Sequence, residues 1–443
     1  MIDNYLPDMR AQYEELPYPE RKPLDETKRI LMPMFDGIDR INHICHGGKK
    51  DFTKNSRILI AGGGTGDSTI FLAEQMRHSD CEIVYLDMSQ ASMAVARERA
   101  DMRGLENITW VHDSILNLPS LGLGPFDHIS CSGVLMVLED PDAGLKALES
   151  VLAEDGSMHI MVYAEYGRFA IYMMQNLLRL INHDTADTTQ KLHNCRELMN
   201  SIHNQHWFHF AKHLYIEQRD IEIYDLFLIS QDRAYTVPEL YDYIEGAGLE
   251  IITLLYENEG LGNLLYEPQA YLQDKAMLES LAKLPLQERQ ASAELLNGRM
   301  GKHSLYAASG SKPQPDSRSL DFIPSLPVTT VNVEAGYQQV RQAVAAPGDF
   351  VVITVNVFNT NITVKKTPHV EGFFRHLDGN KTLREIFDRI IAANQGGGLD
   401  YDKLSTEFED LFVAMRKCDY LPMRHKSIPA YRTGEDMVRH RAY

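Results

Sequence analysis

Cysteine, tryptophan and long apolar runs are scarce in this sequence. Its 443 residues include five cysteines and two tryptophans, and no pair of cysteines has CxxC spacing. An odd number of scattered thiols argues against a disulfide framework and fits a reducing, cytoplasmic compartment. No run of about 18 apolar residues occurs, so we expect no transmembrane helix and no membrane partner. The first ten residues hold two aspartates and lack the apolar core of a secretory signal.

Basic side chains are also few. Lysine and arginine total 44 against 62 aspartate and glutamate residues, a formal net charge of −18. This charge repels a phosphate backbone, so we expect no nucleic-acid partner. It suits a cationic substrate, although solubility alone explains it. His206, His209 and His213 share one helical spacing, but their aromatic neighbours indicate packing, and we predict no metal.

Apolar patterning changes along the chain. We expect a helix over Thr27–Ile44 that stops at Gly47-Gly48. From Arg57, short apolar runs alternate with helical segments, a rhythm typical of a parallel sheet with helices on both faces. The expected strands are Ile58–Ile60, Cys81–Leu86, Ile108–Val111, Phe126–Cys131, Ser157–Tyr163, Leu249–Leu255 and Ser304–Ser309. This is an α/β fold.

The chain divides into five expected parts. These are a helical arm or lid over 1–55, an α/β core over 56–167, a helical insertion over 168–236, the completion of the sheet over 237–310, and a winged-helix-like domain over 321–443. The serine-, glycine- and proline-containing segment 309–315 reads as a linker. We therefore expect truncation near Ser311 to spare ligand binding by the core, unless 321–443 packs against the sheet.

A glycine-rich turn carries the most specific signal. Gly62, Gly64 and Gly66 follow a strand and precede a helix, where free N–H groups meet a ligand. A dinucleotide fingerprint would need glycine at Asp67 or Thr69, and no phosphate-binding Gly-Lys-Ser/Thr follows. Two acids stand at later strand ends. Asp87 can accept ribose hydroxyls and Asp113 an adenine amino group, so the order of these features indicates a nucleoside site.

Residues 57–163 resemble the core of class I S-adenosylmethionine-dependent methyltransferases. The resemblance implies a Rossmann-like, seven-stranded sheet and S-adenosyl-L-methionine as cofactor. The cofactor-binding residues that we expect are Tyr18, Gly62, Gly63, Gly64, Gly66, Asp67, Asp87, Met88, Asp113, Ser114, Ser132, Gly133 and Val134. The family often has an acid at the position of Ile60, where it orients the cofactor's amino end, so that role passes to another group here.

A narrower similarity extends over more of the chain. Segments 12–19, 41–43, 47–48, 161–163 and 373–382 are similar to bacterial methyltransferases with a regulatory middle segment. Some of those enzymes methylate protein lysines. The similarity implies an amine acceptor, on a protein or a small molecule. We also consider a homodimer formed through the helical insertion.

The sequence indicates the residues that would bind the methyl acceptor less clearly. Tyr163, Glu165 and Tyr166 follow the fifth strand and are our catalytic candidates, while Arg233 and Tyr235 are candidates for binding the substrate. Packing or capping explains each of them equally well. A dedicated base is optional, because solvent can take the proton of an amine.

We therefore expect methyl transfer to an amine, such as a protein lysine. The alternatives are a small-molecule O-, N- or S-methyltransferase and a non-catalytic S-adenosylmethionine sensor. We do not expect DNA methylation, since the chain is acidic and Ser132-Gly133-Val134 stands where an Asp/Asn-Pro-Pro-aromatic loop is expected.

Overall fold

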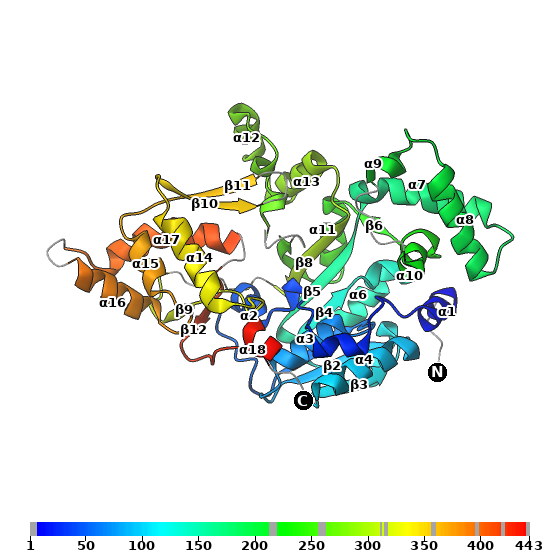
Figure 1. The fold of residues 1–443 in the computed structure, drawn as a ribbon, viewed down its shortest axis with the longest axis horizontal. Coiled ribbons are helices and arrows are strands. Elements are labelled where there is room, and N and C mark those ends of the chain that lie inside the picture. Colours follow the sequence, from blue (N-terminus) through cyan, green and yellow to red (C-terminus); the bar gives the residue numbers. More distant parts are fainter. Residues whose placement is uncertain are drawn as a thin grey trace.

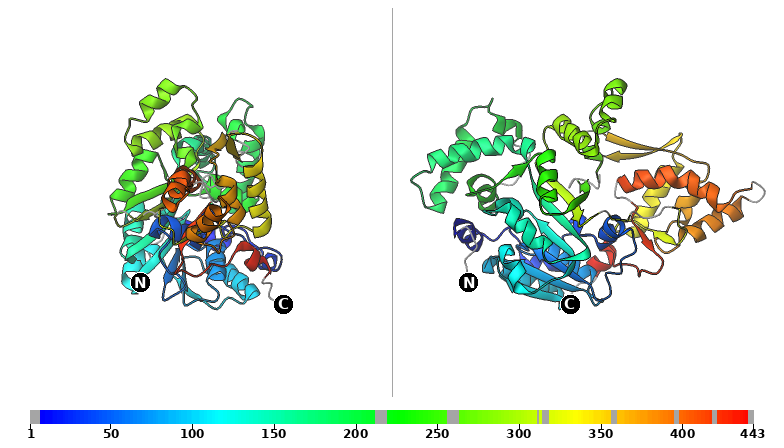
Figure 2. Two further views of the ribbon diagram at one scale, coloured as in Figure 1. Left: turned by 90° about the vertical axis from the view of Figure 1, so that its left-hand side faces the viewer. Right: turned by 180° about the vertical axis from the view of Figure 1, so that it is seen from behind.

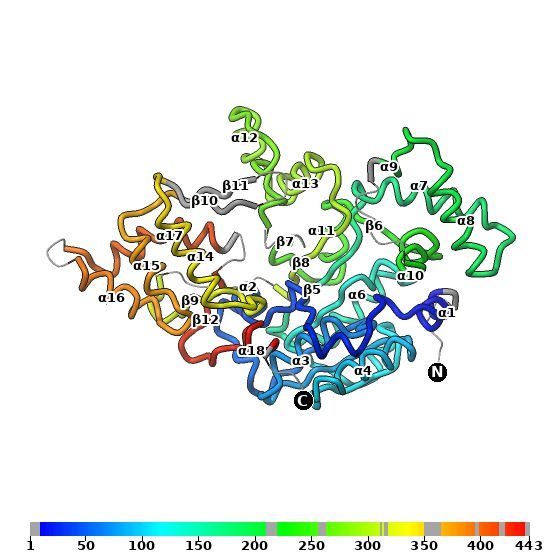
Figure 3. Tube along the Cα trace, viewed as in Figure 1, coloured from blue at the N-terminus to red at the C-terminus, as the bar shows by residue number. Residues whose placement is uncertain are grey.

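The computed structural model describes residues 7–211, 219–255, 263–310, 312–313, 318–355, 360–394, 398–417 and 421–439 (Figures 1 and 3). His213 and part of the expected linker, Ser311 with Gln314 and Pro315, lie outside these ranges. No described helix has the length and apolar character needed to cross a bilayer.

A central sheet with strand order β3-β2-β1-β4-β5-β8-β7 forms the middle of the molecule, and the short β6 pairs with β5 (Figure 1). Its strands are β1 Arg57–Ala61, β2 Glu82–Asp87, β3 Ile108–His112, β4 Phe126–Ser132, β5 Leu152–Ala164, β6 Ala234–Tyr235, β7 Glu250–Leu255 and β8 Lys302–Ala308. All pairs are parallel except those of β8, which runs antiparallel to β5 and β7. The expected Rossmann-like α/β sheet is thereby confirmed.

Helices cover both faces of this sheet, which is why apolar residues of its central strands are buried on both sides. In β1, Leu59 packs into one core cluster while Ile58 and Ile60 pack into another on the opposite face. The first face is covered by α5 Leu118–Leu121, α6 Pro141–Glu149 and α11 Val237–Glu245. The second is covered by α2 Ile38–His46 and α3 Asp67–Gln75. Helix α4 Gln90–Arg103 packs beside β2.

The expected helix over Thr27–Ile44 was too long. The chain instead forms short 3-10 turns, η1 Pro23–Thr27 and η2 Met34–Asp36, before α2 begins at Ile38. Pro33 explains the break, because proline lacks an N–H donor and disfavours helical geometry in the residue before it. The expected stop is confirmed, since Gly47 caps α2 in the left-handed conformation.

The insertion after β5 is helical. It contains α7 Glu165–Ile181, α8 Thr188–Ser201, α9 Trp207–Ala211, α10 Asp220–Ile223 and the π-helical turn η6 Tyr224–Leu228. It has its own apolar cluster, which includes Met174, Cys195 and Phe227. Phe169 and Trp207 stay 56% and 59% exposed on its surface. A homodimer through this insertion stays a prediction. The chain returns to the sheet through α11, α12 Lys275–Leu281 and α13 Leu286–Asn297.

A second unit lies at the opposite end of the molecule from the insertion (Figures 1 and 2). Its elements are β9 Phe322–Pro324, α14 Val333–Ala345, β10 Phe350–Val355, β11 Thr360–Lys365, α15 Val370–His376, α16 Leu383–Ala393, α17 Tyr401–Lys417 and β12 Met423–His425. Strands β10 and β11 form an antiparallel hairpin, and β12 pairs with β9. Helices with short strands fit the expected winged-helix-like class, which stays a prediction.

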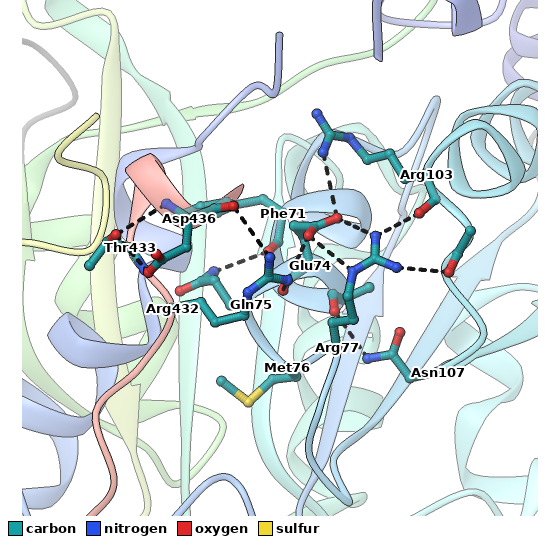
Figure 4. Close-up of polar contacts among 12 residues, drawn as sticks. Phe71, Glu74, Gln75, Met76, Arg77, Arg103, Asn107, Arg432, Thr433 and Asp436 are labelled. Carbon is teal, nitrogen blue, oxygen red and sulfur yellow. Dashed lines mark hydrogen bonds and ion pairs between the residues drawn. The ribbon is translucent and has the colours of Figure 1, made fainter. Parts of the chain in front are cut away.

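The C-terminal segment leaves this unit and packs against the methyltransferase-like sheet domain. Tyr431 and Met437 of the segment join the core cluster beneath β1, and α18 Gly434–Arg439 follows. Arg432 donates from Nη1 to Oε1 of Glu74 on α3 at 2.6 Å (Figure 4). The two units are therefore joined by more than a linker, as in our alternative for residues 321–443. Removing 321–443 would expose part of the core.

Glu74 is the centre of this junction. Its side chain is 0% exposed and pairs with Arg77 at 2.6 Å, Arg103 at 3.5 Å and Arg432 at 2.6 Å (Figure 4). Burial opposes its ionisation, but the hydrogen bonds and charges of Arg77 and Arg432 hold the pKa of Glu74 below its usual value. A buried carboxylate with three cationic partners keeps all four groups satisfied.

Glu74→Gln should lower the free energy of unfolding by about 3–5 kcal/mol, because it leaves buried guanidinium groups without their counter-charge. Urea denaturation measures the change. As a matched control, Arg318→Ala removes an exposed pair with Glu409 and should cost at most about 1 kcal/mol. Equal effects of the two variants would contradict a structural role for Glu74.

Candidate active site

The loop between β1 and α3 adopts backbone geometry that favours glycine. Its residues with positive φ are Gly62, Gly64 and Gly66. A Cβ on Gly62 would lie 2.3 Å from Cγ2 of Val134, and one on Gly64 would lie 2.7 Å from the carbonyl oxygen of Tyr18. Tyr85 supports the loop from β2, since its hydroxyl donates to the Gly64 carbonyl at 2.7 Å. The loop is thus fixed at the N-terminus of α3, and the N–H groups of residues 62–66 all donate to acceptors within the protein.

Two carboxylates stand at the ends of the next strands. Asp87 ends β2 and accepts hydrogen bonds from the backbone N–H groups of Gly64 at 2.7 Å and Ser89 at 2.8 Å. Burial raises the pKa of Asp87, although the two hydrogen bonds act to lower it. Asp113 follows β3, and its Oδ1 accepts from the Ser114 N–H at 2.7 Å. Both acids are therefore held at the carboxyl edge of the sheet, where α/β folds bind ligands.

The N-terminal arm lies against the glycine loop. The N–H and hydroxyl of Thr65 donate to the carbonyls of Tyr18 at 3.3 Å and Pro19 at 2.6 Å. Helix α1 Pro7–Glu15 is fixed nearby, because the Ser89 hydroxyl donates to the Tyr13 carbonyl at 2.9 Å. The arm thus brings two tyrosines to the edge of the sheet that carries Asp87.

Four more of the expected cofactor residues have defined places. Gly133 follows β4 with a φ of 79°, and its N–H donates to the Met161 carbonyl at 3.1 Å. Ser132 is exposed at the end of that strand. The carbonyl of Met88 bonds to the His112 ring at 2.9 Å. Asp67 is engaged by the protein itself, since it pairs with Arg21 at 2.6 Å and Arg99 at 2.7 Å.

A cluster of tyrosines surrounds a buried carboxylate near this edge. We call Tyr13, Tyr18, Tyr163 and Asp225 the tyrosine–aspartate cluster. The Tyr13 hydroxyl donates to Oδ1 of Asp225 at 3.2 Å. Burial and then the charge of Asp225 raise the pKa of Tyr13, Tyr18 and Tyr163, so all three lie close to that carboxylate. Tyr163 was expected from the sequence, whereas Tyr13 and Asp225 were missed.

The insertion also places a cation beside the cluster. The guanidinium of Arg168 lies 3.5 Å from the centre of the Tyr163 ring and pairs with Asp232 at 2.6 Å. Neither Arg168 nor Asp225 belongs to a local sequence motif. Their signal in the sequence is weak, namely charged residues among the apolar residues of helical segments.

The other acceptor candidates have different surroundings. Glu165 and Tyr166 are exposed in the first turn of α7, and the charge of Glu294 on α13 acts on Tyr166. Tyr235 is 0% exposed and its ring stacks on Tyr243 with centroids 4.9 Å apart, so it is part of the core. The exposed Arg233 lies over that ring, 4.5 Å from its centre.

The residues present fit a nucleoside. The glycine loop packs so closely on Val134 and Tyr18 that a Cβ on Gly62 or Gly64 would clash. The Asp87 carboxylate lies beside it, at the adjoining strand end, and can accept further hydrogen bonds. Ile60, which stands where the family often has an acid, is 3% exposed and packs in the core.

Comparison with known proteins agrees with this geometry. Residues 59–158 match the family described as a methyltransferase domain. An uncharacterised protein of Synechococcus sp. is 33% identical over 265 residues, which is 59% of this chain and 62% of that protein. A ubiquinone biosynthesis O-methyltransferase of Acinetobacter baumannii is 25% identical over 134 residues, 30% of this chain and 55% of that protein. The chain thus spans less than two thirds of both relatives.

A solved structure shares the fold over most of the chain. PKMT2 from Rickettsia typhi, in complex with AdoHcy, is similar with a TM-score of 0.61 and 14% identity. The match covers 89% of this chain and 76% of that one, so it includes both units. Residues 59–158 therefore carry a methyltransferase domain, and the chain shares the fold of this solved structure.

Proposed function

We propose that this protein transfers a methyl group from S-adenosylmethionine to an amine, such as the side chain of a protein lysine. The observation that carries the proposal is the tyrosine–aspartate cluster beside the glycine loop. Aromatic rings and a carboxylate attract a cation, whereas they repel an anionic acceptor. The net charge of −18 favours a basic partner in the same way.

The chain's own residues have distinct tasks in this proposal. S-adenosylmethionine supplies, when bound, an electrophilic methyl group on a sulfonium sulfur. The glycine loop and the N-terminus of α3 would line its site, with Asp87 accepting from the ribose and Asp113 from adenine. Tyr18 would cover the site from the arm. Tyr163 and the rest of the cluster would orient the acceptor and exclude water, which brings the reacting groups into line.

Label transfer tests the nature of the acceptor. We expect S-adenosylmethionine with a radioactive methyl group to label the protein fraction of a cell extract, and hydrolysis of that fraction to yield methylated lysine. Omitting the enzyme gives the background. Label in small molecules alone would favour the runner-up, a small-molecule methyltransferase, and no label in either fraction would favour a cofactor sensor.

Substitution of the ribose acid tests the cofactor site. Asp87→Ala should weaken binding of S-adenosylhomocysteine by about 100-fold or more, because two hydroxyls lose a charged acceptor and each such bond contributes about 1.5–3 kcal/mol. Calorimetry measures the affinity. Asp101→Ala, at an exposed aspartate on α4, is the matched control and should bind as the wild type does. Unchanged binding by a folded Asp87→Ala variant would contradict the assignment.

A further inference from the structure

We propose that Asp225 binds the ammonium group of the methyl acceptor and takes its proton before methyl transfer. The inference rests on the proposed function and assigns one residue of this chain to the step that an amine requires. An ammonium has no lone pair, so it must lose a proton before its nitrogen can attack.

Position is the first argument for Asp225. It lies in η6, a π-helical turn, and such turns occur frequently at functional sites. The residue is 8% exposed, which is unusual for an aspartate unless it is paired or has a function. Its hydrogen bond from Tyr13 links it to the arm, whose next residues contact the glycine loop through Tyr18. The carboxylate therefore lies between the insertion and the expected cofactor site.

The surrounding charges are the second argument. Arg168, the cation next to the cluster, is paired with Asp232 at 2.6 Å. The titratable and charged groups around Asp225 are Tyr13 from α1, Tyr18 from the arm, Tyr163 from β5, Arg168 from α7, Asp232 from the loop before β6 and Lys302 from β8. Burial raises the pKa of Asp225 to about 6, against the hydrogen bond from Tyr13 and the charge of Arg168. At neutral pH the group is an anion that accepts a proton more readily than an ordinary aspartate.

The proton transfer itself balances simply. The N–H bond of the ammonium breaks, the proton forms an O–H bond with the Asp225 carboxylate, and the electron pair stays on nitrogen. A lysine ammonium has a pKa of about 10.4 in water. Enclosure by the tyrosine rings narrows the difference between the pKa of this ammonium and the pKa of Asp225, because desolvation lowers the pKa of an ammonium and raises that of a carboxyl. The protonated Asp225 then returns its proton to solvent.

Binding of an amine gives a test that does not depend on turnover. The probe is n-butylamine, an analogue of the lysine side chain, titrated by ligand-observed NMR into protein saturated with S-adenosylhomocysteine. For the wild type, affinity should fall as the pH drops through about 6, because the carboxyl becomes neutral while the probe stays cationic. For Asp225→Asn, the Kd at pH 7.5 should rise about tenfold or more and should not vary between pH 5 and 8.

Two further variants separate recognition from folding. Tyr13→Phe removes one hydrogen bond that lowers the pKa of Asp225, so the fall in affinity should move to higher pH. Asp220→Asn, at a 61% exposed aspartate of α10, is the matched control and should leave amine binding unchanged.

The outcomes are distinguishable from those for the proposed function. Wild-type binding of n-butylamine by Asp225→Asn, together with wild-type methylation of lysine, overturns the role of Asp225 and leaves lysine methylation standing. Loss of S-adenosylhomocysteine binding in Asp225→Asn indicates a structural role and also overturns it. Label transfer by the wild type to acceptors without an amine overturns the proposed function itself.

Discussion

A chain of buried ion pairs holds the N-terminal arm in place, and the geometry of the site depends on it. From the C-terminal segment to the N-terminal arm, its members are Arg432, Glu74, Arg103, Glu26, Arg99, Asp67 and Arg21. The distances between successive charged groups are 2.6, 3.5, 2.5, 2.7, 2.7 and 2.6 Å. Arg99 and Glu26 are 2% and 4% exposed, so each needs its partner to offset the loss of solvent. Charges this well buried favour one arrangement of the arm, because any other would leave them unpaired.

Two consequences follow from this arrangement. The arm carries Tyr13 and Tyr18, so both halves of the site, the glycine loop and the tyrosine–aspartate cluster, share one support. The chain of ion pairs also begins at Arg432, beyond the second unit. That unit is thereby anchored to the same helix, α3, whose N-terminus meets the glycine loop. The C-terminal segment therefore ties the second unit to the core beside this loop.

The residues that follow a recognisable strand pattern could be predicted from the sequence. Gly62, Asp87 and Asp113 stand at the ends of short strands, and parallel strands place their carboxyl ends together, so their position at one edge of the sheet could be predicted. Asp225 could not be, because its partners come from α1, β5 and α7, and only the packed insertion brings them together. The sequence also suggests Tyr235 as a binding residue, but β6 pairs with β5 and the Tyr235 ring is buried in the core against Tyr243.

A crystal structure of the protein with S-adenosylhomocysteine tests the central claim most directly. The account predicts the ribose hydroxyls within hydrogen-bonding distance of the Asp87 carboxylate and the adenine beside Asp113. It also predicts that the homocysteine sulfur, which marks the departed methyl group, faces Tyr163 and Asp225. A ligand bound at another edge of the sheet, or a sulfur directed away from the tyrosine–aspartate cluster, would contradict it.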